Sequence, residues 1–200
     1  MKCLFCQQNL KEKMNFLYLF KNNNTFLCEK CQYNLKLKKT KIGNFTHFYF
    51  SDYKESKEII CKIKYTLDVE KAKIFQSLLN NFFKKNNFDI ITVCPTNKTR
   101  LAIRGFNHVE IILDICKIYY QNIFYQKYRE KRATMTKRRT YDDFFIFEKY
   151  KELIAKSHSI LIIDDILTSG KTLLSLAREV KKINNNIEIS FLTLAKTAPK

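Results

Sequence analysis

The sequence predicts an α/β fold in which a parallel sheet flanked by helices follows a small module held together by cysteines. Short apolar runs typical of buried parallel strands alternate along the chain with segments whose apolar residues recur at helical spacing. Two pairs of cysteines precede these segments. A chain of 200 residues accommodates one α/β domain of about 150 residues and an appendage too short to fold without a cross-link. We therefore expect a module over residues 1–42 and a domain over residues 43–200.

The N-terminal module contains Cys3-x-x-Cys6 and Cys28-x-x-Cys31, separated by 21 residues. Two such pairs can bring four thiolates to one tetrahedral zinc ion, with two ligands from each turn. The separation is slightly longer than in most zinc ribbons, but closing a longer loop costs little extra entropy. Disulfides or a redox-active pair would use the same spacing, although disulfides require an oxidising compartment. We recognise no signal peptide, and three further cysteines lie in apolar patterns, so we expect a structural zinc site of the zinc-ribbon type.

The larger domain begins with an aromatic, β-prone run at Phe45–Phe50. Two segments with apolar residues at helical spacing follow, at Lys54–Leu67 and Val69–Phe83, and we expect both to be helices that face the core. A short apolar strand is predicted at Asp89–Val93, followed by a helix between Phe106 and Tyr120. This alternation of strands and helices is the basis for the predicted parallel sheet.

The chain between residues 160 and 172 combines a buried strand, two carboxylates and a turn rich in hydroxyl groups. Ile160–Ile163 has the apolar character of a parallel strand, a helical pattern runs from Leu173 to Ile183, and Ile187–Leu194 is predicted as the last strand. A turn at a helix N-terminus favours an anion, whereas carboxylates accept hydrogen bonds from hydroxyl groups. Asp164 and Asp165 beside this turn therefore favour a ligand that carries both a phosphate and a ribose.

The same segment resembles the phosphoribosyl-pyrophosphate loop of the type I phosphoribosyltransferases. This resemblance implies a type I phosphoribosyltransferase-like sheet, ribose hydroxyls at Asp164 and Asp165, and Mg²⁺ on the pyrophosphate of the ligand. It also implies that the 5′-phosphate lies in the turn formed by Thr168, Ser169, Gly170, Lys171 and Thr172, where Lys171 replaces a residue that is usually small. Ser-Gly-Lys-Thr is also the end of a nucleotide P-loop, but that motif needs glycine at the position of Asp165. An ordinary strand, turn and helix remains an alternative.

The segment from Cys94 to Asn107 follows a predicted strand and ends in Arg104-Gly-Phe-Asn107. Together with the cysteine pairs and the acidic loop, this signature resembles the ComF competence proteins over nearly the whole chain. The position of Arg104 after the strand makes it a candidate ligand for the pyrophosphate, because arginine forms bidentate contacts with phosphate groups. A surface ion pair is the alternative role for Arg104.

The chain carries a formal net charge of +18, and its basic residues cluster between residues 127 and 139. Candidate contacts to single-stranded DNA in this cluster are Arg129, Arg132, Arg138 and Arg139. A solvated loop would have the same composition. The ComF resemblance further implies a competence helicase and a recombination-loading protein as partners. No apolar run is long enough to span a membrane, so we expect a cytoplasmic protein.

Two functions remain open at this point. The ComF resemblance implies an accessory protein of natural transformation that handles single-stranded DNA and retains a site for phosphoribosyl pyrophosphate or a related sugar phosphate. The intact acidic loop equally allows an active Mg²⁺-dependent phosphoribosyltransferase of nucleotide metabolism. No catalytic residue is identified, because His47, His108 and His158 are isolated in the sequence and we expect each to be a surface or packing residue.

Overall fold

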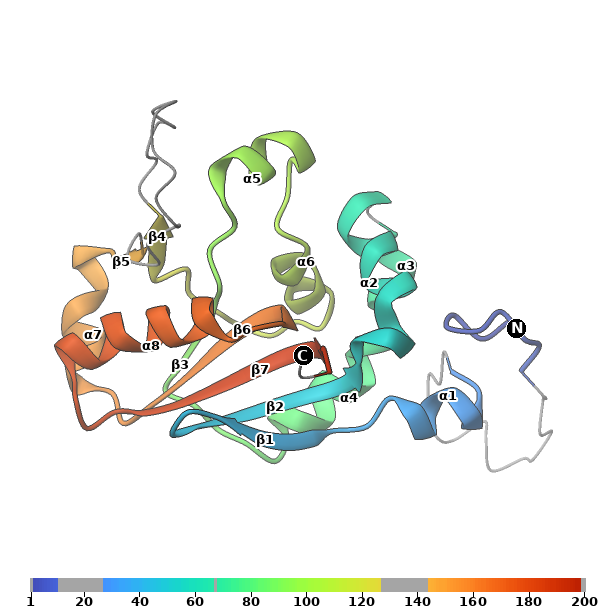
Figure 1. The fold of residues 1–200 in the computed structure, drawn as a ribbon, viewed down its shortest axis with the longest axis horizontal. Helices are drawn as coiled ribbons and strands as arrows, with labels where there is room; N and C mark the ends of the chain where they lie inside the picture. The colour runs from blue at the N-terminus through green and yellow to red at the C-terminus, as the bar shows by residue number, and fades with distance from the viewer. Residues whose placement is uncertain (1, 11–26, 67, 127–143, 199–200) are drawn as a thin grey trace.

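The computed structural model describes residues 2–10, 27–66, 68–126 and 144–198. Its centre is a five-stranded sheet in the order β1-β2-β7-β6-β3 (Figure 1). The strands β2, β7, β6 and β3 are parallel to their neighbours, and β1 pairs with β2 in an antiparallel hairpin. The bounds of the strands are Lys38–Ile42 for β1, Phe45–Asp52 for β2, Ile90–Val93 for β3, Ser159–Leu167 for β6 and Glu188–Lys196 for β7. The predicted α/β class and its largely parallel sheet are confirmed.

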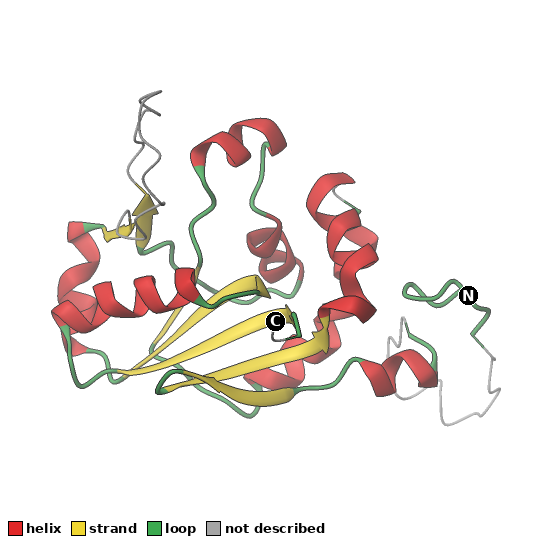
Figure 2. Ribbon diagram, in the orientation of Figure 1, coloured by secondary structure: helices red, strands yellow, loops and turns green. Residues whose placement is uncertain are grey.

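Helices cover both faces of this sheet (Figure 2). Because side chains alternate along a strand, Leu161 and Ile163 of β6 face one layer, while Ile160 and Ile162 face the other. The first layer contains α2 (Tyr53–Thr66), α3 (Val69–Ala72), α4 (Ile74–Phe83) and α6 (His108–Ile115). The second contains α7 (Lys151–Lys156) and α8 (Lys171–Ile183). Each face of the sheet is therefore buried against its own hydrophobic core, as a parallel sheet requires.

The N-terminal segment packs against the first of these cores. Cys3, Leu27, Cys31 and Leu35 are buried in the same cluster as the helices of the first layer. The helix α1 (Glu29–Asn34) begins directly after Cys28 and contains Cys31. The sheet includes β1, and therefore the last five residues of the segment 1–42. Among the described residues, no helix is both long and apolar enough to cross a membrane.

Several elements differ from their predicted form. The single helix expected at Val69–Phe83 is divided at Lys73, where the backbone N–H groups of Lys73 and Gln76 bond to carbonyls three residues earlier. A short helix, α5 (Lys98–Arg104), occupies the connection between β3 and α6. The remaining elements are a 3₁₀ turn (Glu148–Tyr150) and a two-stranded ribbon of β4 (Phe124–Gln126) and β5 (Phe144–Ile146). None of these was predicted, because each is too short for its periodicity to be recognised.

Candidate functional site

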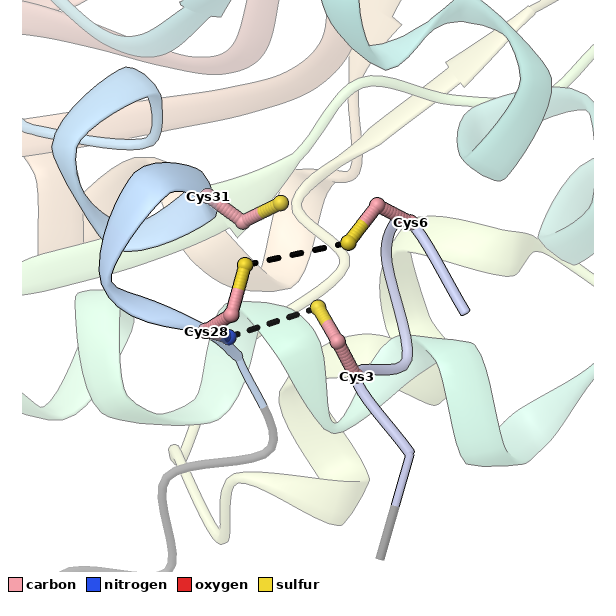
Figure 3. Close-up of side chains that lie close together, drawn as sticks. All are labelled: Cys3, Cys6, Cys28 and Cys31. Atoms are coloured by element: carbon pink, nitrogen blue, oxygen red, sulfur yellow. Dashed lines mark hydrogen bonds between the residues drawn. The ribbon is translucent and has the colours of Figure 1, made fainter. Parts of the chain in front are cut away.

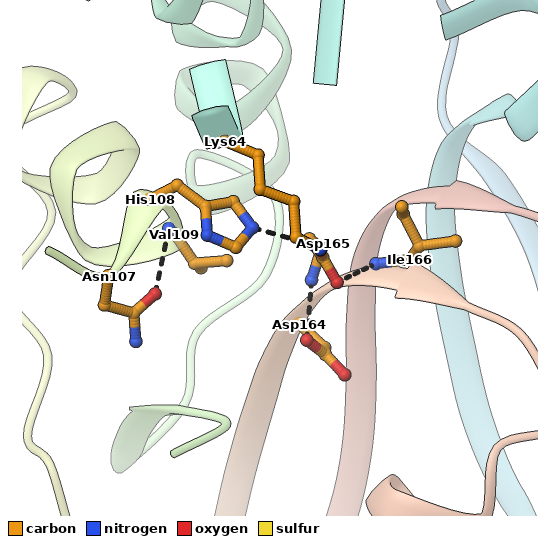
Figure 4. Close-up of polar contacts among 7 residues, drawn as sticks. All are labelled: Lys64, Asn107, His108, Val109, Asp164, Asp165 and Ile166. Carbon is orange, nitrogen blue, oxygen red and sulfur yellow. Dashed lines mark hydrogen bonds and ion pairs between the residues drawn. The ribbon is translucent and has the colours of Figure 1, made fainter. Parts of the chain in front are cut away.

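The two adjacent carboxylates lie at the carboxyl end of β6, between β3 and β7 in the sheet. This is the end at which parallel α/β sheets bind ligands. Alternation along the strand places Asp165 on the same face as Leu161 and Ile163, toward the layer of α2 and α6. Asp164 is directed to the other side, as the close-up shows (Figure 4). The pair is therefore divided between the two faces of the sheet.

Asp165 is buried and is held by side chains from two helices (Figure 4). Its Oδ2 lies 2.9 Å from Nε2 of His108, the first residue of α6, and forms an ion pair with Nζ of Lys64 near the end of α2. Its Oδ1 accepts a hydrogen bond of 2.7 Å from the backbone N–H of Ile166. Burial by itself raises the pKa of a carboxyl, but the hydrogen bond from His108 and the charge of Lys64 hold the pKa of Asp165 well below its usual range.

Asp164 has a different environment. Its Oδ1 accepts a hydrogen bond of 2.8 Å from the backbone N–H of Asp165, and among the described residues it forms no ion pair. Burial, followed by the negative charge of Asp165, raises the pKa of Asp164. The neighbouring Cys94, which follows β3, also has a raised pKa, first because of burial and then because of the charge of Asp164. The surroundings therefore favour the uncharged forms of Asp164 and Cys94 and the ionised form of Asp165.

The turn after β6 brings the start of α8 to the same edge of the sheet. Gly170 has φ +72°, a left-handed conformation, and immediately precedes α8. A Cβ atom at this position would lie 3.0 Å from Cγ2 of Ile42 in β1, so the turn packs closely on the outer hairpin of the sheet. Thr168 and Ser169 are exposed and Thr172 is half-buried. With the N-terminus of a 13-residue helix behind them, these hydroxyl and backbone N–H groups can bind an anion.

Arg104 lies at the end of α5, where its guanidinium stacks on the ring of Tyr65 at 4.9 Å from the ring centre. Tyr65 is the neighbour of Lys64 in α2, so consecutive residues of one helix contact Asp165 and Arg104. Asn107 caps α6 by accepting a hydrogen bond from the N–H of Val109, which begins the helix at His108 (Figure 4). The end of the Arg-Gly-Phe-Asn signature therefore determines where His108 stands.

Lys64, His108 and Tyr65 were not identified from the sequence. His108 was expected to be only a surface or packing residue, and that expectation is incomplete, because the side chain is buried and also bonds to Asp165. Its position directly after Arg-Gly-Phe-Asn is a signal that could have drawn attention to it. Lys64 offers no such signal, since several lysines on the same helix are indistinguishable in sequence.

The four N-terminal cysteines form a second candidate site (Figure 3). The sulfur atoms of Cys3, Cys6, Cys28 and Cys31 all lie within 4.8 Å of one another, and those of Cys6 and Cys28 are 3.7 Å apart. Thiolates bound tetrahedrally to zinc at 2.3 Å are about 3.8 Å apart, so this spacing fits a metal. The backbone N–H of Cys28 donates to Sγ of Cys3, a bond that stabilises a thiolate. The four cysteines are positioned to bind a metal ion, and the arrangement is compatible with structural zinc.

The predicted DNA contacts at Arg129, Arg132, Arg138 and Arg139 lie outside the described residues. The described chain resumes on either side of them as β4 and β5, which pair through three successive residues each. The stem of the ribbon is aromatic: the ring of Tyr125 stacks near those of Phe145 and Phe147, with centre separations of 5.5 and 4.7 Å.

Comparison with known proteins finds a similar competence protein. No protein-family model matches the chain. The chain is 28% identical over 214 residues to competence protein ComFC of Streptococcus pneumoniae (strain ATCC BAA-255 / R6), an alignment that covers 92% of this chain and 93% of that protein. This chain is therefore similar to a ComF competence protein along almost the whole of both chains. The alignment covers nearly the whole chain, and the four cysteines meet in the structure, so the resemblance to the ComF competence proteins is confirmed.

Proposed function

We propose that this chain is a ComF-type cytoplasmic accessory protein of natural transformation that handles incoming single-stranded DNA and binds phosphoribosyl pyrophosphate or a related sugar phosphate. The competence role is supported by the likeness to ComFC along almost the whole of both chains. A competence helicase and a recombination-loading protein are the partners that such a role calls for.

The ligand is supported by one arrangement at the edge of the sheet: a carboxyl pair at the end of β6 is followed, after two residues, by a glycine turn that opens α8. Carboxyl groups accept hydrogen bonds from ribose hydroxyls, and the turn binds the 5′-phosphate. Mg²⁺ would accompany the pyrophosphate group of the ligand. The cysteine cluster is assigned a structural zinc ion and no part in the binding of the sugar.

The competence role is tested by deleting the gene and measuring transformation with linear donor DNA. We expect the deletion to abolish transformation without creating a nucleobase requirement, and the wild-type gene to restore it. Asp164→Ala should fail to restore it, whereas Asp52→Ala, which removes an exposed carboxylate elsewhere on the sheet, should succeed. Normal transformation in the deletion strain would contradict the proposal.

A role in nucleotide metabolism is the second candidate, and the intact acidic loop is the observation that favours it. An active phosphoribosyltransferase would release pyrophosphate when supplied with phosphoribosyl pyrophosphate, Mg²⁺ and a nucleobase. Turnover that depends on Asp164, together with a nucleobase requirement in the deletion strain, would establish this function in place of the first.

The DNA contact is tested by the salt dependence of binding to a labelled single-stranded oligonucleotide. Replacing both Arg138 and Arg139 with Ala should lower affinity about equally for all sequences, because phosphate contacts carry no sequence information. The log–log slope should fall by about one to two, since each phosphate contact on a single strand contributes about −0.7. The matched control replaces Lys181 and Lys182, near the end of α8, with Ala. An unchanged slope in the arginine variant would exclude this segment as the binding surface.

A further inference from the structure

Asp164 and Asp165 of β6 differ in their hydrogen-bond partners and in their burial, and this difference indicates that the two carboxyls have different roles. We propose that Lys64 and His108 are positioning residues of the sugar-phosphate site, which fix Asp165 and leave Asp164 as the carboxyl that meets the ribose hydroxyls. The assignment rests on the proposed function, because it concerns the same ligand site. It departs from the resemblance to phosphoribosyltransferases, which implies that both carboxylates contact the ribose.

Asp165 has little capacity left for a ligand. A carboxylate offers about four lone-pair directions. Three donors already use them: the N–H of Ile166 at Oδ1, and the side chains of Lys64 and His108 at Oδ2. A ribose hydroxyl that bonded to Oδ2 would have to displace a charged or ring donor. The carboxylate is therefore committed to bonds within the protein.

The donors to Asp165 are enclosed by protein. The side chains of Lys64, Asp165 and His108 expose only 16%, 11% and 7% of their surface. They come from α2, β6 and α6, so the cluster joins three elements at the carboxyl end of β6. Because buried ion pairs are screened little by water, removal of one member leaves an uncompensated charge. Such a cluster holds the backbone of Asp164 and Asp165 in one place relative to both helices.

Asp164 has the opposite properties. It is half-buried, receives one hydrogen bond from the N–H of Asp165, and lies on the other side of β6 (Figure 4). Among the described residues no cation or ring donor bonds to it, and the nearby Cys94 thiol is only a weak donor that a hydroxyl group can displace. The raised pKa of Asp164 means that the group can hold a proton near neutral pH, so that it can donate to one ribose oxygen while accepting from another.

The test compares binding of ribose 5-phosphate with binding of 2-deoxyribose 5-phosphate by calorimetry on the full chain. The ratio of the two affinities measures the contact to the 2-hydroxyl, and the affinity for either sugar measures the site as a whole. Asp164→Asn should lower the ratio about tenfold or more. Lys64→Met should lower both affinities by a similar factor and leave the ratio near its wild-type value, and Lys64→Arg should restore affinity because it retains the charge.

Two matched variants separate positioning from folding. Lys62→Met removes an exposed lysine of the same helix, which pairs with Glu58, and should bind as the wild type does. The double variant with Lys64→Met and Asp165→Asn removes both charges of the buried pair, so it avoids an isolated buried charge if Lys64→Met alone does not fold. The double variant should keep the wild-type ratio, because Asp164 remains.

The role of His108 is tested in the same assay. His108→Leu removes the donor to Asp165 and should weaken both sugars equally, while His108→Gln, whose amide can still donate, should recover part of the affinity. His158→Leu, at an exposed position, is the control.

Three results would overturn the assignment. In the first, the ratio collapses in the double variant, which would place Asp165 on the ribose. In the second, Lys64→Met and His108→Leu both bind as the wild type does. In the third, the wild type binds neither sugar, which overturns the proposed ligand itself and this assignment with it. The first two leave the proposed function intact, so the two failures are distinguishable.

Discussion

The cysteine cluster and the acid pair are two sites of one chain that are held together in different ways. The four cysteine sulfurs meet at the N-terminus, where the described backbone contributes one isolated bridge, between Lys2 and Asn9, and the short helix α1. The acid pair stands on a strand that is bonded to neighbours on both sides and is covered by long helices. The proposed zinc ion would hold the first arrangement together, whereas the fold itself holds the second.

Because of this difference, we expect disruption of the two sites to affect different parts of the folded structure. Loss of the ion should affect the N-terminal segment and leave the sheet folded. Loss of the Asp165 carboxylate should instead lower the stability of the whole domain, because its partners Lys64 and His108 are enclosed by protein. Four predictions test this contrast, beginning with the largest expected effect.

Removing the metal should have the largest effect, because structural zinc contributes about 10 to 16 kcal/mol to the folding of small zinc modules. We expect the purified protein to carry about one zinc per chain, bound by the four cysteines. Cys28→Ser should lose the metal, and hydrogen exchange should rise at residues 2–10 and 27–35 but not in β6 or β7. Cys61→Ser, on α2, should retain the metal. A metal-free protein with a protected N-terminal segment would contradict the zinc assignment.

Asp165→Asn should lower the free energy of unfolding by about 3 to 5 kcal/mol at pH 7, since it leaves Lys64 with a buried and unpaired charge. The pKa of Asp165 is lowered in the folded protein, so its contribution is present above the unfolded pKa and is lost as the pH falls. Urea unfolding should therefore show a difference from the wild type that shrinks between pH 7 and pH 3. Asp52→Asn, which breaks an exposed pair with Lys38, should cost less than about 1 kcal/mol.

Asp164→Asn should show the opposite dependence on pH. Because the pKa of Asp164 is raised, the folded protein keeps a proton that the unfolded chain has lost, and stability falls as the pH rises from about 4 through the raised pKa. Asparagine does not titrate, so the variant lacks this loss. The free energy of unfolding of the variant minus that of the wild type should therefore grow between pH 5 and pH 8. The growth should be smaller than the cost of Asp165→Asn, because Asp164 is only half-buried. A parallel pH profile for the two variants would refute the division between the two carboxyls.

Gly170→Ala should have the smallest effect on stability. A left-handed φ costs a residue with a Cβ atom about 1 to 2 kcal/mol, and here the new atom would also press on Ile42. Gly105 also has a left-handed φ, of +79°, but a Cβ atom there would have nothing within 4 Å. Thermal unfolding should show a larger loss for Gly170→Ala than for Gly105→Ala. Equal losses would mean that the contact with Ile42 does not shape the turn.

The predictability of the two sites follows the same contrast. The convergence of the four cysteines was predicted from the sequence, because the cluster consists of the two Cys-x-x-Cys pairs alone and their spacing can be read directly. At the acid pair the sequence identified Asp164 and Asp165 but not their partners, since Lys64 and His108 stand 101 and 57 residues from Asp165. Short-range patterns carry no information about such contacts.

Parts of the fold were missed for a related reason. The sequence of β1 is mostly lysine and has no apolar strand pattern, so it was not predicted. In the structure its residues are alternately half-buried and exposed, and its pairing with β2 makes it a strand. The long strands and helices were predicted because burial on the sheet imposes a regular period on their sequence.

The separation of Lys64 from Asp165 along the chain also has a consequence for the order of folding. The contact closes a loop of 101 residues, and contacts of such sequence distance form slowly because the intervening chain must first be organised. During synthesis α2 is made long before β6. Lys64 therefore has no contact with Asp165 until the last third of the chain has been made. The proposed sugar-phosphate site can therefore form only after β6 has been made, and a chain that ends before Asp165 would lack the partner that Lys64 binds.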